Sequence, residues 1–185
     1  MFAAARHRLA RVPRGLTLIE LLVALAIVAV LFAAAMPSWG RYFAEQGLRE
    51  RADALADSFL VARTEAIRRG GRVAVCPRAA DRCVSGATGW ESGWLVFADE
   101  NRNGSYDPGE IIVSRAGSAP PGVTIRGNRP VSDYVSYTSL GQLRRNDGAL
   151  QMGTFVVCRS GYAGRKVILA NGGRVRIAPA EETCP

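Results

Sequence analysis

A long apolar run near the start of the chain limits what this sequence can fold into. Residues 16–36 carry only two polar side chains, and the next charged residue after them is Arg41. A stretch of about 20 apolar residues can cross a bilayer as a helix. The charges that precede the run are all basic, so the positive-inside rule keeps the N-terminus in the cytoplasm. The sequence therefore predicts a transmembrane helix over residues 16–41 and a globular, extracytoplasmic domain over residues 42–185.

The same run also fits a cleaved secretory signal. The cleavage site of such a signal follows its apolar segment, and the alanines at positions 33–35 match that requirement. Composition alone leaves both interpretations open.

The helix is expected to continue past the apolar run to about residue 69. Proline removes a backbone hydrogen bond, so Pro37 predicts a kink, and the glycines at 70–71 predict the end of the helix. Beyond the kink, apolar residues recur at spacings of three, four and seven, which predicts one helix face packed on a core. These residues are Leu48, Leu55, Phe59, Ala62, Ala66 and Ile67.

The rest of the chain has the pattern of short strands separated by turn residues. We expect strands at 72–76, 93–98, 110–115, 123–126, 134–138, 154–159, 165–170 and 174–178. The last three are expected to form a meander, because glycine-rich turns at 161–164 and 171–173 separate them. The predicted fold class is α+β, a long N-terminal helix packed on antiparallel β-sheet.

The four cysteines contain no C-x-x-C pair, so a zinc site is not expected. In an oxidising compartment two disulfides are the default, and four cysteines allow three pairings. We favour the pairings that are local in sequence, and free buried cysteines are the alternative. The favoured pairs are Cys76–Cys83 and Cys158–Cys184.

The junction between the basic start and the apolar run has the sequence RGLTLIE, residues 14–20. It resembles the class III signal of type IV pilins and pseudopilins. The resemblance implies a leader over residues 1–15, cleavage after Gly15 by a prepilin peptidase, and methylation of the new N-terminus at Leu16. The family usually has phenylalanine at this first position. This chain departs from the pattern there, with Leu16 instead. The combination of basic leader, glycine, TLIE run and apolar helix nevertheless favours a pilin signal over a secretory signal.

Glu20 lies near the start of the predicted membrane helix. An unpaired carboxylate in such a helix costs roughly 2.5–3.5 kcal/mol. The amine freed at Leu16 is a suitable partner, and the family pattern pairs this glutamate with the N-terminus of a neighbouring subunit. The alternative is that the carboxylate reaches the lipid headgroups. We predict that Glu20 serves filament assembly.

Two further segments narrow the resemblance. The sequence GWESGWLVF at 89–97, followed by DENRNG at 99–104, resembles the FimT/GspH group of minor pilins and pseudopilins. The C-terminal part, with TFVVC at 154–158 and GRVR at 173–176, resembles the FimT side of that group. This implies a pilin-like fold, filament partners, an inner-membrane location and a periplasmic domain.

In FimT-like proteins a Gly-Arg-x-Arg element contacts DNA during natural transformation, and Gly173, Arg174 and Arg176 match it. Residues two apart on a strand point to one face and lie about 6.6 Å apart. Phosphates of one DNA strand advance about 3.4 Å each along the axis, so two such arginines suit neighbouring phosphates. The alternative is an ordinary solvated strand face.

Charge distribution supports a polyanionic partner. The formal net charge is +8, and residues 126–176 contain nine basic side chains against two acidic ones. Such asymmetry is typical of a surface that faces a polyanion. We therefore predict double-stranded DNA as a partner, with a purely structural minor pilin or type II secretion pseudopilin as the alternative. The remaining candidate contacts are Arg144, Arg145, Arg165 and Lys166.

A polar segment has the spacing of an EF-hand loop, which predicts a possible calcium site and no other cofactor. Its flanks have the pattern of strands rather than helices, and turn chemistry explains the same polar residues. The candidate ligands are Asp99, Asn101, Asn103, Ser105, Asp107 and Glu110.

The residues of the chain also bear on base stacking and on enzymatic catalysis. Trp90 and Trp94 could stack nucleobases, although such a pair is more typical of a core. The only histidine, His7, lies in the predicted leader, so the mature chain has no Ser/His or Cys/His arrangement. The sequence therefore predicts no enzyme.

Overall fold

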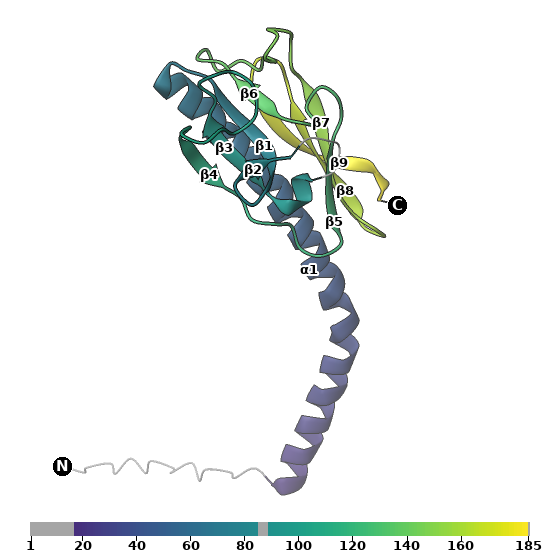
Figure 1. The fold of residues 1–185 in the computed structure, drawn as a ribbon. Helices are drawn as coiled ribbons and strands as arrows, with labels where there is room; N and C mark the ends of the chain where they lie inside the picture. Colours follow the sequence, from purple (N-terminus) through teal and green to yellow (C-terminus); the bar gives the residue numbers. More distant parts are fainter. Residues whose placement is uncertain (1–16, 85–88, 185) are drawn as a thin grey trace, which may run out of the picture. The chain divides into compact units, whose positions relative to one another are not determined.

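The computed structural model describes residues 17–84 and 89–184, with the backbone alone at 34–38 and 182. A long helix, α1 (Leu18–Arg69), is followed by short strands (Figure 1). The chain divides into two compact units, Met1–Arg41 and Tyr42–Pro185. The predicted α+β fold class is confirmed.

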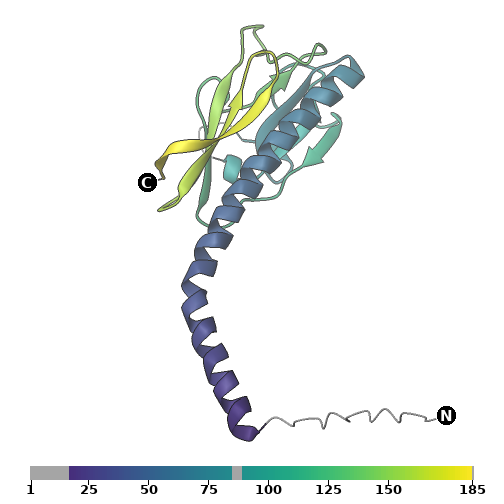
Figure 2. The same cartoon turned by 180° about the vertical axis from the view of Figure 1, so that it is seen from behind.

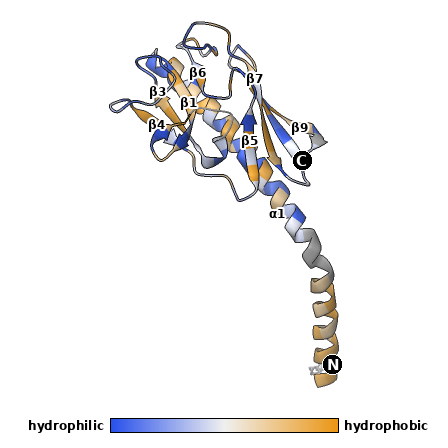
Figure 3. Cartoon of the chain, turned by 45° about the vertical axis from the view of Figure 1, so that its right-hand side comes forward, coloured by the Kyte–Doolittle hydropathy of each residue, from blue (hydrophilic) through white to orange (hydrophobic). Residues whose placement is uncertain are grey.

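The N-terminal unit contains the first part of α1, whose described side chains are almost all apolar and exposed (Figure 3). Within the part of the chain that the structure describes, no helix is long and apolar enough to span a membrane. The predicted leader with Gly15 and Leu16, and the side chain of Pro37, lie outside the described residues.

The helix begins with the spacing of a capping box, Thr17-x-x-Glu20. The backbone N–H of Glu20 donates to Thr17 Oγ1 at 3.3 Å, which satisfies one of the unpaired donors of the first helical turn. A carboxylate in the first turn also interacts favourably with the helix dipole. Glu20 therefore has a local structural role besides the predicted role in assembly.

In the second unit, one face of α1 supplies the centre of the core. Leu48, Leu55 and Phe59 are buried, and so are Ala52 and Ala56 between them. The ring of Phe59 lies 5.4 Å from that of Phe155, which belongs to β7 (Gly153–Arg159). Ile67 was expected on this face but is 52% exposed. It follows the buried Ala66 by one residue, which turns its side chain roughly 100° around the helix.

The first sheet has the order β2-β1-β3-β4, with β6 also paired to β1, and all its pairings are antiparallel. Its main strands are buried on both faces, which explains their nearly continuous apolar sequence. One face packs on the core with α1, and the other lies beneath Tyr106 and Tyr134. The strands are β1 (Val73–Ala79), β2 (Arg82–Cys83), β3 (Trp94–Ala98), β4 (Ile112–Arg115) and β6 (Val135–Tyr137).

The second sheet has the order β5-β7-β8-β9 and is antiparallel throughout. Its inner face is buried in the same core, while the side chains between the buried ones point outward. Figure 2 shows this sheet and the first sheet on either side of the domain part of α1. The new strands are β5 (Val123–Gly127), β8 (Ala163–Leu169) and β9 (Val175–Thr183). This alternation leaves one broad sheet face exposed.

The predicted meander is confirmed as β7-β8-β9, and both favoured disulfides are present, Cys76–Cys83 and Cys158–Cys184. Several strand boundaries were wrong. The largest differences are at the ends of β1, which extends to Ala79, and β9, which extends to Thr183, while β8 begins at Ala163 within the predicted turn 161–164. The short strand β2 was also missed. Cys184 follows β9 directly and is joined to β7, so the C-terminal end stays beside the sheet.

Trp90 and Trp94 both belong to the core, which confirms the favoured interpretation and excludes the base-stacking alternative. Trp90, in the 3-10 helix η1 (Trp90–Ser92), and Trp94 are fully buried. The indole N–H of Trp90 donates to the carbonyl of Ser132 at 2.7 Å, and that of Trp94 donates to Ser58 Oγ at 2.8 Å. With their polar atoms satisfied inside the domain, neither ring can stack on a base.

Candidate nucleic-acid interface

A tight turn joins β8 to β9 and positions the Gly-Arg-Val-Arg sequence. The amide of Gly173 donates to the carbonyl of Ala170 at 2.8 Å, and the amide of Ala170 donates to the carbonyl of Arg174 at 3.0 Å. Gly173 has a φ of +80°, a conformation that favours glycine. A three-residue hairpin loop that ends in a left-handed residue has this geometry. The predicted turn at 171–173 is confirmed.

Gly173 is also a point of close packing between distant segments. A Cβ at this position would lie 2.0 Å from the carbonyl oxygen of Gly141. Arg63 of α1 donates from Nη1 to the carbonyl of Gly173 at 3.2 Å, and the amide of Leu143 donates to the carbonyl of Asn171 at 2.9 Å. The turn is thus fixed against the helix on one side and the 141–143 segment on the other.

Arg174 and Arg176 are exposed at the start of β9. Arg174 directly precedes the strand, and Arg176 is its second residue. Both side chains, together with Ile168, line a shallow cavity of about 380 Å³. Within residues 17–84 and 89–184, neither guanidinium has a hydrogen-bond or ion-pair partner. The pair is therefore available to an external anion.

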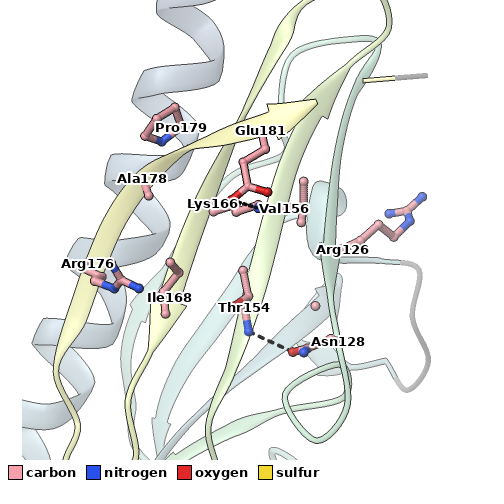
Figure 4. Close-up of a pocket in the computed structure, with 11 residues that line it drawn as sticks. Arg126, Asn128, Thr154, Val156, Lys166, Ile168, Arg176, Ala178, Pro179 and Glu181 are labelled. Atoms are coloured by element: carbon pink, nitrogen blue, oxygen red, sulfur yellow. Dashed lines mark hydrogen bonds and ion pairs between the residues drawn. The ribbon is translucent and has the colours of Figure 1, made fainter. Parts of the chain in front are cut away.

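The outward face of the second sheet continues from this pair (Figure 4). Arg176 lies opposite Ile168 in the register, and Lys166 lies two residues before Ile168 on the same face of β8. A groove of about 710 Å³ includes both cations. The rest of its lining is mostly small or aliphatic, including Thr154, Val156, Ile168 and Ala178.

Two carboxylates accompany the cations of this face. Lys166 Nζ lies 3.9 Å from Glu181 Oε1, and the Glu181 side chain is 91% exposed. Arg126 Nη1 lies 2.5 Å from Glu91 Oε2, and both side chains are partly buried. Burial is the largest single influence on Glu91 and by itself would raise its pKa. The hydrogen bond and charge of Arg126, together with backbone hydrogen bonds, outweigh burial and hold this pKa below its ordinary value. Arg126 is therefore the more firmly paired cation.

The other residues predicted to contact DNA do not lie on this face of the sheet. Arg165 pairs with Val157 and Pro179, so it points to the opposite face of β8 from Lys166. Arg145 Nη2 lies 3.3 Å from Asp147 Oδ2. The carbonyls of Arg144 and Arg145 accept hydrogen bonds from Arg72 at 3.0 and 3.2 Å, so their backbone has a structural role.

Three residues of the interface were missed by the sequence analysis, namely Arg63, Gly141 and Glu181. Arg63 had a detectable signal, because it lies one turn after Phe59 at the edge of the buried helix face. An arginine there needs a partner across the packing interface. Gly141 and Glu181 gave no comparable signal, since their roles depend on chain segments that meet only in the folded domain.

The predicted calcium loop is held together by its own hydrogen bonds. The carboxylate of Asp99 accepts from the amides of Asn103 at 2.9 Å and Gly104 at 3.1 Å. Glu110 accepts from the amides of Glu100 and Asp107, each at 3.0 Å. Among the described residues, no group of three or more His, Cys, Asp or Glu side chains is placed to hold a metal ion. Calcium binding stays a prediction.

Replacing Asp99 by alanine is expected to lower the free energy of unfolding by about 2 kcal/mol, because two backbone donors beneath this buried side chain lose their acceptor. Asp107→Ala is the matched control. Its side-chain partners, the amides of Asn101 and Asn103, are exposed and can bond to water, so a loss below about 1 kcal/mol is expected. Urea unfolding of both variants measures the difference, and equal losses would contradict this account of the loop.

The comparisons with known proteins agree with this architecture. The family model described as type II transport protein GspH matches residues 51–173, and that of the prokaryotic N-terminal methylation motif matches residues 11–36. The pilin-like protein PilA1 of Thermus thermophilus is 34% identical over 166 residues, which cover 89% of this chain and 97% of the relative.

Among solved structures, the type IV minor pilin FimU of Pseudomonas aeruginosa matches with a TM-score of 0.54 and 19% identity, covering 75% of this chain and 92% of that chain. A second crystal form of FimU gives 0.51 and 19%, with 71% and 93% covered. These structures support the fold alone. The methylation motif and the pilin relatives indicate a membrane-anchored protein with a structural rather than an enzymatic part in a filament. The chain belongs to the GspH family and is a minor pilin or pseudopilin of a type IV pilus or a type II secretion system.

Proposed function

We propose that this chain is a FimT-like minor pilin that binds duplex DNA without sequence preference for uptake in natural transformation. The observation that carries the proposal is the pair of exposed arginines Arg174 and Arg176, which have no partner among the described residues and directly follow a turn held by Arg63. A planar guanidinium matches the oxygens of a phosphate and can donate two hydrogen bonds to it. Because Arg63 fixes the backbone of the turn, little backbone entropy is lost when the pair meets DNA.

The outward sheet face favours contact with the DNA backbone. Its lining residues include no aromatic side chain on which a base could stack. Contacts to phosphates position a protein on DNA but carry no sequence information. Binding is therefore proposed to be non-specific and to prefer duplex DNA over single strands.

The proposed location follows from the N-terminal segment. Cleavage after Gly15 by a prepilin peptidase leaves Leu16 as the methylated first residue, and residues 16–41 anchor the protein in the inner membrane. The domain then lies in the periplasm. Glu20 is proposed to pair with the N-terminal amine of a neighbouring pilin, in addition to its place at the start of the helix.

Binding of the domain of residues 42–185 to duplex DNA is the direct test. This unit is compact and contains the core and both disulfides, so we expect it to fold without the N-terminal unit. We expect equal affinity for unrelated duplexes of one length, and a linear fall of log affinity with log salt. Fluorescence anisotropy over a salt series measures both. A domain that fails to bind duplex DNA even at low salt would contradict the proposal.

That negative result would favour the second candidate, a structural pseudopilin without DNA binding. The observation in its favour is the match of residues 51–173 to a family described as a type II transport protein. Both candidates have the same membrane anchor and the same fold, and they differ in DNA binding. The DNA-binding experiment therefore distinguishes them.

A further inference from the structure

We propose that bound duplex DNA continues from the turn onto the outward face of the second sheet. There Lys166 is the third phosphate-binding residue, and Glu181 is a carboxylate that the phosphate displaces. This inference rests on the proposed DNA binding at Arg174 and Arg176. It adds a path for the polyanion and a residue that opposes binding.

The register of the sheet gives the path. Arg176 lies directly opposite Ile168, and Lys166 is the diagonal neighbour of Arg176 on the same face. Diagonal neighbours on adjacent strands lie about 7–8 Å apart. Phosphates of one DNA strand advance about 3.4 Å each along the axis and also wind around it, so this separation suits neighbouring phosphates. Lys166 is therefore spaced to hold a later phosphate of a strand already bound at the turn.

The surface along this path is open. The groove that contains Arg176 and Lys166 has a volume of about 710 Å³, and small or aliphatic side chains separate the two cations. Figure 4 shows Ile168 and Ala178 near Arg176, with Lys166 and Glu181 facing each other further along. None of the residues that line this groove is aromatic.

Glu181 occupies the place that the phosphate would take. Its carboxylate lies 3.9 Å from Lys166 Nζ and is almost fully exposed, and such surface pairs contribute little to stability. A phosphate can therefore replace it at small cost. While it remains, however, Glu181 repels the incoming phosphate. Its removal should strengthen binding.

Arg126 marks the far limit of the path. It shares a row across the sheet with Lys166, because both are in register with Val156 on β7. Unlike Lys166, Arg126 is held by Glu91 at 2.5 Å and by the carbonyl of Ile125 at 3.1 Å. A phosphate would have to break the closer ion pair. Arg126 is thus a cation on the same face that the DNA should not use.

Three single variants of the domain of residues 42–185 test the inference on one duplex over a salt series. Lys166→Gln is expected to flatten the slope of log affinity against log salt by about 0.9, the value for one phosphate contact. Arg126→Gln is the matched control and should leave the slope unchanged. Glu181→Gln should raise affinity about two- to fivefold. The melting temperature of each variant shows that it folds.

The double variant Lys166→Gln/Glu181→Gln tests whether Glu181 competes with the phosphate for Lys166. If Glu181 acts by competing at Lys166, its removal should give no gain once Lys166 is neutral. A full gain in the double variant would overturn the inference, because Glu181 would then act only through overall charge. Equal changes in slope for Lys166→Gln and Arg126→Gln would also overturn it. In both cases wild-type binding would leave the proposed function standing, whereas absence of wild-type binding would reject both.

Discussion

Replacement of Gly173 by alanine is expected to lower the free energy of unfolding of the domain by about 3 kcal/mol. Two effects add at this position. A φ of +80° costs about 1–2 kcal/mol for a residue with a Cβ. The new methyl group would also lie 2.0 Å from the carbonyl oxygen of Gly141, and overpacking of this kind costs about 1–3 kcal/mol. Urea unfolding of the domain of residues 42–185 measures the loss.

Gly161→Ala separates the two effects. Gly161 has the same φ of +80°, but a Cβ there would meet nothing within 4 Å. Its replacement should cost only the backbone part, about 1–2 kcal/mol. Equal losses in the two variants would show that the contact with Gly141 does not constrain the turn. A larger loss at Gly173 supports a turn that holds Arg174 in a fixed place.

Changing both Arg174 and Arg176 to glutamine is expected to weaken binding to all duplex sequences about equally. If each arginine neutralises one phosphate, the slope of log affinity against log salt should flatten by about 1.8. The fold should be unaffected, because neither guanidinium has a partner within the described residues. Anisotropy over a salt series measures the slope, and thermal unfolding checks the stability.

The control removes two charges elsewhere. Arg49 on α1 and Arg82 on β2 are exposed, and neither side chain has a partner within the described part of the domain. Arg51 is unsuitable, because its guanidinium donates to the carbonyls of Gly117 and Ser118. The Arg49→Gln/Arg82→Gln variant should retain most of the slope. If both double variants lose the same amount, binding reflects overall charge rather than a site at the turn.

Much of the fold could be predicted because its signals are local. The helical spacing of Leu48, Leu55 and Phe59 predicts a buried face, and each is buried. The glycines of the 171–173 turn predict a hairpin, and β8 and β9 form it. Helix and hairpin patterns depend on residues a few positions apart, so the sequence displays them directly.

The candidate interface could be predicted only in part. Gly173, Arg174 and Arg176 were found by resemblance, and the structure places both arginines together beside Ile168. Charge alone groups Arg165 with Lys166, but neighbouring residues of a strand point to opposite faces. The alternation of side chains along β8 therefore separates the two residues.

By itself, the sequence determined the long helix with its buried face, the β7-β8-β9 meander and a basic C-terminal segment. Only the tertiary structure decided that Gly173 packs beneath Gly141 and binds Arg63 of the distant helix. It also decided that Lys166 meets Glu181 while Arg126 meets Glu91. The physical reason is that local patterns follow from the periodicity of the backbone. Contacts between distant segments depend on strand register and on how the helix packs between the sheets, which no short stretch of sequence contains.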